Sequence, residues 1–454
     1  MQRLQFSGWM ILVAMVAWPT PAPGQDDGQA ASIERGRRAL TEQGHLPGAW
    51  SLDAYRKVGS FWDGDVPDPE ADPDGYFRAF CRQYGLHPAP YPNDGLPMGL
   101  RKAARRDGSP GLQIDCMVCH GGSIGGRSYV GIGNTTLDLR SLLDDLTRAD
   151  GKAVPPALFT LTTTRGTVNA GQIAIALFSF RNPDLSRRGL PLRTGAWLPE
   201  LDTPAWWNLG PKTTMYQDGR TDARSHRSIM QFFLDAYSAD DFRKKEPVFA
   251  DVMAYLKSQQ PPRYPFPIDD ELVSRGRSLF EKSCARCHGN YGPDGSVDYP
   301  NVVVELDRIG TDSKRSDGIS RRFVEHVNAS WFGEEYPVEL EAVGYQAPPL
   351  RGVWATAPYL HNGMVPTLDD LLNSTKRPSR FRRPESTDFE HYDTKRVGWK
   401  YGVVEGAIPD GLKPREARFY ADTARFGLGN GGHTFGDALT EDERLAVIEF
   451  LKTL

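Results

Sequence analysis

Two copies of one five-residue motif carry most of the reactive side chains of this 454-residue sequence. The copies are Cys116-Met117-Val118-Cys119-His120 and Cys284-Ala285-Arg286-Cys287-His288. In C-x-x-C-H, two thiols add to the vinyl groups of one haem and the histidine becomes the proximal iron ligand. A thioredoxin-like thiol pair leaves both histidines unexplained, and four-cysteine zinc sites usually space their C-x-x-C units more closely. The sequence therefore predicts two covalently bound haem c groups, attached through Cys116, Cys119, Cys284 and Cys287, with His120 and His288 as iron ligands.

The fifth cysteine, Cys81, stands apart from both motifs. A single cysteine of this kind usually behaves as a small apolar side chain. We expect a buried free thiol, with an intermolecular disulfide as the alternative.

The composition is that of an ordinary folded protein. The chain has 39% hydrophobic residues and a net charge of −4. Its length suggests two or three domains, and its charge balance offers no basic surface for nucleic acid.

The C-terminal half has clear helix signals around the second motif. Asp269-Asp270-Glu271 can start a helix whose Gly276 and Phe280 share one face. Thr440 to Glu443 is a capping box that opens the last helix. Cytochrome c domains cross their first and last helices at a glycine, so we expect Gly276 to meet residues 446–450.

The N-terminal half is expected to end in the same way. Pro247 is placed at a helix start, followed by Val248, Val252 and Leu256. The proline-rich run 261–267 then predicts a stiff spacer between domains. The predicted fold is mainly α, with two tandem cytochrome c-like domains and long loops, over residues 25–262 and 268–454.

The first 24 residues are predicted to be a secretory signal peptide. Arg3 precedes a short apolar run, Trp9 to Trp18, and small and proline residues follow up to Gly24. The run is short for a membrane span. We expect a periplasmic or secreted protein, associated with a membrane only if this segment stays uncleaved.

A short internal repeat supports two related halves. When Thr203-Pro204-Ala205-Trp206-Trp207-Asn208 is laid on the segment Pro348 to Gly352, Pro204 meets Pro348 and Gly219 meets Gly363. Gln217 then stands where the second half has His361. The two haems are therefore expected to be inequivalent.

The sixth ligand decides whether an iron transfers electrons or binds a small molecule. For the second haem, the preferred ligand is His433, which lies in a glycine-rich loop shortly before the last helix. His361 and Met364 are the alternatives.

For the first haem the candidates are Met215, Met230 and His226. The aromatic residues Trp206, Trp207, Tyr216, Phe232 and Phe233 can instead wall an apolar pocket or simply fill a core. We expect an open or weakly ligated first iron, with His226, Trp206, Trp207 and Gln217 on its distal side as the catalytic candidates.

Around these residues the chain resembles the superfamily of dihaem cytochrome c peroxidases, the methylamine-utilisation dihaem enzyme and the rubber oxygenases. The resemblance rests on Trp206 to Arg220, on Ala357-Pro358-Tyr359-Leu360-His361-Asn362-Gly363, and on the closing residues 450–454. It spans roughly residues 95–454. The segment from Lys376 to His433 is closest to the rubber-oxygenase-like branch.

One departure from the peroxidases affects the expected chemistry. The segment after Asp218-Gly219 lacks the glutamate that helps peroxidases cleave peroxide, which leaves Asp222 and His226 as proton carriers. The resemblance also allows a Ca²⁺ ion between the domains, although no motif supports one.

The predicted function is that of a periplasmic dihaem oxidoreductase. A six-coordinate second haem exchanges electrons with a reactive first haem that activates peroxide or dioxygen. The expected partners are a small periplasmic electron-transfer protein and the small-molecule oxidant. The alternative is a dihaem electron carrier without substrate chemistry. A haem-based sensor is a third class, but the sequence has no recognisable output domain for it.

Overall fold

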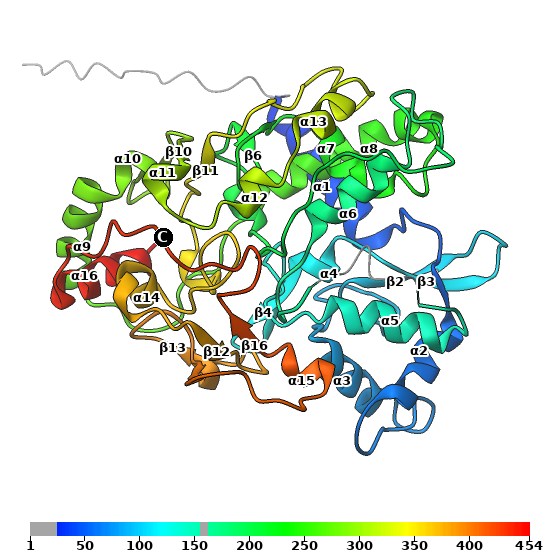
Figure 1. Ribbon diagram of the computed structural model, residues 1–454, viewed down its shortest axis with the longest axis horizontal. Coiled ribbons are helices and arrows are strands. Elements are labelled where there is room, and N and C mark those ends of the chain that lie inside the picture. Colours follow the sequence, from blue (N-terminus) through cyan, green and yellow to red (C-terminus); the bar gives the residue numbers. More distant parts are fainter. Residues whose placement is uncertain (1–24, 155–161) are drawn as a thin grey trace, which may run out of the picture.

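The computed structural model describes residues 25–154 and 162–454 and shows a mostly helical chain with several small sheets (Figure 1). The predicted signal peptide, residues 1–24, lies outside the described residues. Within these two ranges, no helix is both long enough and apolar enough to cross a bilayer.

Eight helices in the described residues have at least eight residues each. They are α1 Gln25–Glu42, α3 Pro73–Tyr84, α5 Leu139–Ala149, α6 Ala170–Ser179, α8 Ala239–Ser258, α9 Asp270–Ser283, α13 Arg321–Asn328 and α16 Glu441–Leu451. Shorter α-helices are α2 Leu52–Lys57, α4 Met117–His120, α7 Arg227–Met230, α10 Ala285–His288, α11 Leu306–Ile309, α12 Lys314–Asp317, α14 Leu368–Leu372 and α15 Pro414–Ala417. Turns of 3-10 helix are η1 Val58–Phe61, η2 Trp206–Asn208, η3 Gln231–Phe233, η4 Val353–Ala355, η5 Ser374–Lys376 and η6 Phe389–His391.

The sheets are small and antiparallel. Two have three strands, in the orders β1-β3-β2 and β15-β12-β16, and the others are two-stranded. The strands are β1 Trp50–Ser51, β2 Leu100–Ala104, β3 Pro110–Ile114, β4 Gly121–Ile124, β5 Arg127–Val130, β6 Thr214–Met215, β7 Thr221–Asp222, β8 Asn290–Tyr291, β9 Val297–Asp298, β10 Val303–Glu305, β11 Gly344–Gln346, β12 Arg380–Arg382, β13 Tyr392–Asp393, β14 Gly398–Trp399, β15 Gly402–Val403 and β16 Tyr420–Asp422.

Helices α9 and α16 cross at a glycine, as the sequence predicts. The Asp269 carboxylate caps α9, and Thr440 and Glu443 form the capping box of α16. A Cβ on Gly276 would lie 1.9 Å from the Ala446 carbonyl oxygen. Only a glycine allows the two helices to approach this closely.

A second crossing pair, α1 and α8, has the same construction (Figure 1). A Cβ on Gly36 would lie 2.0 Å from the Asp251 carbonyl oxygen. The prediction that Pro247 starts the second helix is wrong, because α8 begins eight residues earlier with a capping box formed by Ser238 and Asp241. Pro247 lies inside the helix.

The buried apolar side chains form three large clusters. One surrounds α9 and α16 and includes Phe280, Trp354 and Phe450. A second surrounds α1 and α8, and a third lies under α2, α3 and α5. Cys81 is a buried free thiol in α3, as predicted.

One late segment returns to the beginning of the chain. We call residues 383–418 the return segment. Arg418 forms an ion pair with Asp138 at 2.9 Å, and the Gly125 N–H donates to the Thr387 carbonyl oxygen at 2.7 Å. Figure 1 shows α15, at the end of this segment, beside α3. The two halves of the sequence are therefore joined along an extended contact.

Candidate haem sites

The first motif forms the short helix α4 directly after the sheet β1-β3-β2. The Asp115 carboxylate accepts the Met117 N–H at 2.9 Å and so starts the turn. Gly99, at φ +96°, approaches the motif so closely that a Cβ would lie 2.4 Å from the Val118 Cα. Cys116 and Cys119 are free thiols on this turn.

The second motif forms α10, directly after α9. The Cys284 N–H continues the hydrogen-bonding pattern of α9 by donating to the Phe280 carbonyl oxygen at 2.7 Å. Gly289, at φ +89°, ends the turn. Helix α9 therefore fixes the second motif to the crossing with α16.

A proline carbonyl lies beside each motif histidine. His288 Nδ1 donates to the Pro348 carbonyl oxygen at 2.8 Å. Burial lowers the pKa of His120 to about 4, and the Pro204 carbonyl partly opposes this shift. The sequence repeat pairs these same two prolines. At His288, the carbonyl at Nδ1 selects the tautomer that leaves the Nε2 lone pair free for a metal. His120 Nδ1 is buried and makes no hydrogen bond.

His433 faces His288. The centroids of the two imidazole rings lie 6.2 Å apart, with the rings inclined by 59°. Two histidine–metal bonds of about 2.0–2.1 Å each, together with the half-widths of two rings, account for this separation. Burial, followed by the neighbouring His288, lowers the pKa of His433 to about 4, so its ring stays neutral. The residues present fit an iron held between these two histidines.

Arg377 holds the loop that carries His433. All five of its N–H groups donate to backbone carbonyl oxygens, at 2.7–3.2 Å. The acceptors are Asp370, Leu371, Asn430, Gly432 and His433. One side chain thus ties the loop of residues 430–433 to helix α14.

The opposite side of this loop rests on the residues after α11. The His433 N–H donates to the Ile309 carbonyl oxygen at 2.7 Å, and His433 itself has a φ of +45°. A Cβ on Gly432 would lie 2.2 Å from the Gly310 carbonyl carbon. The loop is held from two sides, which fixes where His433 points.

His361 lies elsewhere. Its ring stacks on Tyr345, with centroids 4.3 Å apart and planes inclined by 18°. Its Nε2 is buried without a hydrogen-bond partner, and burial lowers its pKa to about 3, with Arg315 adding to the shift. Met364 is fully buried in a small cluster with Phe381 and Leu428. Of the three candidate ligands, the structure brings only His433 into ring contact with His288.

The surroundings of His120 are different. The Trp206 ring stacks against it, with centroids 4.8 Å apart and planes inclined by 27°. In the described residues, His120 has no ring contact with a second histidine. Met230 is fully buried in the same apolar cluster as Trp206. Met215 belongs to another cluster, and its sulfur accepts a hydrogen bond from the Ser228 hydroxyl.

The four predicted catalytic residues do not gather around one point. Trp207 belongs to the α9–α16 cluster, and its Nε1 donates to the Arg351 carbonyl oxygen at 2.7 Å. The Gln217 carbonyl accepts the Gln346 N–H at 2.7 Å. His226 lies 3.2 Å from the Glu246 carboxylate, which also binds Arg227.

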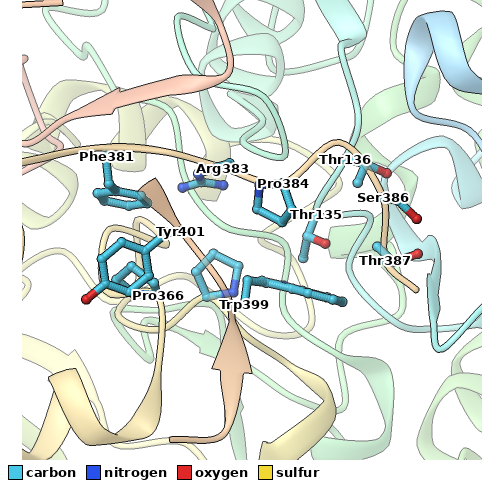
Figure 2. Close-up of a pocket in the computed structure, with 11 residues that line it drawn as sticks. Thr135, Thr136, Pro366, Phe381, Arg383, Pro384, Ser386, Thr387, Trp399 and Tyr401 are labelled. Atoms are coloured by element: carbon cyan, nitrogen blue, oxygen red, sulfur yellow. The ribbon is translucent and has the colours of Figure 1, made fainter. Parts of the chain in front are cut away.

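A small cavity lies between the return segment and Thr135 and Thr136 (Figure 2). Its volume of about 20 Å³ is room for a single water molecule. In Figure 2, Arg383 and Trp399 lie along it. The cavity is too small for haem or for an organic substrate.

The described residues offer no cluster of three or more histidine, cysteine or acidic side chains for a further metal ion. The calcium ion that the resemblance allows has no such group of ligands there. Sequence reasoning assigned no structural role to Arg377, because the acceptors of an arginine in a loop are not evident until the fold is known.

Three comparisons place the chain among known proteins. Residues 344–382, which include His361, α14 and Arg377, match the family described as RoxA-like, cytochrome c-like. Two uncharacterised proteins of Sinorhizobium fredii are similar. Protein y4iJ is 27% identical over 43% of this chain and 41% of its own length, and y4iM is 29% identical over 46% of this chain and 52% of its own. The chain thus spans about half the length of these relatives.

Among solved structures, hydrazine synthase of Kuenenia stuttgartiensis aligns at 13% identity and a TM-score of 0.21. The alignment covers 62% of this chain and 87% of that one. The family match agrees with the rubber-oxygenase resemblance expected from the sequence, and residues 344–382 are similar to the RoxA-like, cytochrome c-like family.

Proposed function

We propose that this protein is a dihaem c-type cytochrome with one haem bound to each C-x-x-C-H motif, in two tandem cytochrome c-like units. Two features support the duplication. Each half has a pair of helices that cross at a glycine, Gly36 or Gly276. In each half a proline carbonyl also lies beside the motif histidine.

The second haem is the electron-transfer centre. The observation that carries this proposal is the face-to-face arrangement of His288 and His433, 6.2 Å apart between ring centroids. An iron with two histidine ligands has no place for a substrate and exchanges electrons only. Arg377 and the Ile309 carbonyl hold His433 in position for this role.

The first haem is the reactive one. Trp206 stacks on His120 and belongs to a buried apolar cluster that also contains Phe233. A haem iron with one protein ligand can bind and activate peroxide or dioxygen. Asp222 and His226 are engaged with Arg224 and Glu246. The glutamate that helps peroxidases cleave peroxide is absent from the segment after Asp218-Gly219. We therefore expect slow turnover of peroxide.

Consecutive tryptophans connect the two sites. Trp206 contacts His120, and Trp207 donates to the Arg351 carbonyl, three residues after the Pro348 that binds His288. This short route between the motif histidines supports electron exchange between the two haems.

The proposed setting is the periplasm, reached through the signal peptide of residues 1–24. The proposed partners are a small electron-transfer protein and the oxidant.

The first experiment counts the haems. The denatured mature protein should keep two haems per chain by mass, and Cys119→Ala and Cys287→Ala should each release one. A mass that shows one haem, or zinc, would overturn the proposal.

The second experiment assigns the ligand. His433→Ala should convert the second haem to a high-spin or water-bound form, while His361→Ala leaves it low-spin. The opposite result would show that His361 is the ligand. Cyanide and carbon monoxide should change the spectrum of about half the haem, which tests the reactive site. No change in either haem would favour the electron carrier.

A further inference from the structure

A buried cluster of charges lies beside His361. Asp218, Arg220 and Arg315 are each at most 7% exposed. Arg315 Nη1 donates to Asp218 Oδ2 at 3.0 Å, and Arg220 Nε lies 3.6 Å from the same oxygen. Two guanidinium groups therefore share one carboxylate, and the cluster has a net charge of +1.

The cluster contains several buried nitrogens without a partner. Arg220 Nε and Nη1, Arg315 Nε and His361 Nε2 make no hydrogen bond. Buried donors are almost always satisfied, and those on charged groups cost the most when they are not. The free guanidinium nitrogens belong to the two arginines that flank Asp218, and Arg315 is close enough to His361 to lower its pKa. Guanidinium donors that are buried together without an acceptor point to an acceptor that binds there.

The cluster flanks the loop that carries His433. Arg315 lies on α12, shortly after Thr311, and the Thr311 N–H is 2.3 Å from where a Cβ on Gly432 would be. Tyr345, which stacks on His361, donates to the Asp312 carbonyl oxygen at 2.7 Å. Asp218 and Arg220 reach this place from the other half of the chain.

We infer that Arg220, Arg315 and His361 form a binding site for a single carboxylate. One carboxylate cancels the surplus charge, whereas a phosphate dianion would leave a buried negative charge. Planar guanidinium groups also match the geometry of a carboxylate. The same surplus charge disfavours a Ca²⁺ ion at this position.

This site deepens the proposed function, because one source of the carboxylate is a propionate group of the second haem. The other source is a free carboxylate from solution. Both sources present the same carboxylate group to the site, so an experiment must distinguish them.

The test uses Arg220→Gln in the haem-loaded protein, with Arg224→Gln as a matched control. Arg224 lies in the same hairpin but is exposed. If a propionate binds there, losing the cation beside it should lower the reduction potential of the second haem. We expect about a tenfold change in the oxidised-to-reduced ratio, which is about 59 mV for one electron. The propionate bands in resonance Raman spectra should shift as well, and Arg220→Lys should restore most of the potential.

If a free carboxylate binds instead, acetate should shift the potential of the wild-type protein in a saturable way, and Arg220→Gln should abolish that response. The inference is overturned if the potential and the Raman bands of folded Arg220→Gln match those of Arg224→Gln and acetate has no effect on the wild type. If Arg220→Gln fails to fold, His361→Gln, which leaves the ion pairs intact, is measured in the same way. The haem count and the low-spin spectrum of the wild type test the proposed function separately.

Discussion

Arg377 is expected to control whether the second iron can bind external ligands. All five of its N–H groups hold carbonyls of the loop of residues 430–433 or of α14. In Arg377→Gln at most two donors remain and the charge is lost, so about three hydrogen bonds disappear. A hydrogen bond from a charged donor contributes about 1.5–3 kcal/mol, and we take ~1 kcal/mol for each bond because Arg377 is only partly buried.

The loss of ~3 kcal/mol should raise the population of the open loop, and with it the apparent affinity for cyanide, roughly 10²-fold. The assay is absorbance titration of the oxidised second haem with cyanide. Arg380→Gln is the control, because Arg380 is three residues away and pairs with Asp422 rather than with the loop. Equal cyanide affinity in both variants and the wild type would refute the idea that Arg377 holds the loop closed.

Three further predictions concern packing, pH and electron transfer. Gly276→Ala should destabilise the fold by ~1–3 kcal/mol, read from the denaturation midpoint, because the new Cβ overlaps the Ala446 carbonyl. Gly28→Ala, on α1 in open space, should be neutral or stabilising, and equal effects would contradict the helix-crossing argument. Burial lowers the pKa of His87 from 6.5 to about 4. Between these pH values the unfolded state binds more protons than the folded state. The free energy of unfolding should therefore fall by roughly 3 kcal/mol as the pH falls through this window. His87→Asn should flatten the pH dependence of the melting temperature, and an unchanged slope would refute this reading. Trp207→Phe removes the hydrogen bond to the Arg351 carbonyl and should slow electron exchange between the haems after flash reduction, whereas a wild-type rate would exclude Trp207 from the route.

Local sequence signals correctly predicted the two crossing helices of the second half and their caps. The Thr440 capping box, the Asp269 cap and the crossing at Gly276 depend on residues that are close in sequence, or on a steric demand that only glycine meets. The short repeat also paired Pro204 with Pro348, which both lie beside a motif histidine.

The remaining features depend on contacts between distant residues. Gly36 has no local signature, and its crossing with α8 appears only when the two helices meet. Pro247 was misplaced because a proline can also occupy a helix interior, where the stronger signal is the capping box at Ser238. Arg220 and Arg315 belong to different halves of the chain and meet only in the fold.

The return segment has a consequence for how the molecule assembles. Residues 383–418 come late in the chain, yet the Gly125 N–H donates to the Thr387 carbonyl oxygen and Arg418 pairs with Asp138, in regions far earlier in the sequence. Contacts between residues so far apart in sequence close slowly, because the loop entropy must be overcome first. The N-terminal half thus stays unfinished until most of the chain has been made. We therefore expect the thiols Cys116 and Cys119 to stay accessible until the return segment closes over the region, which would leave time for haem to be attached.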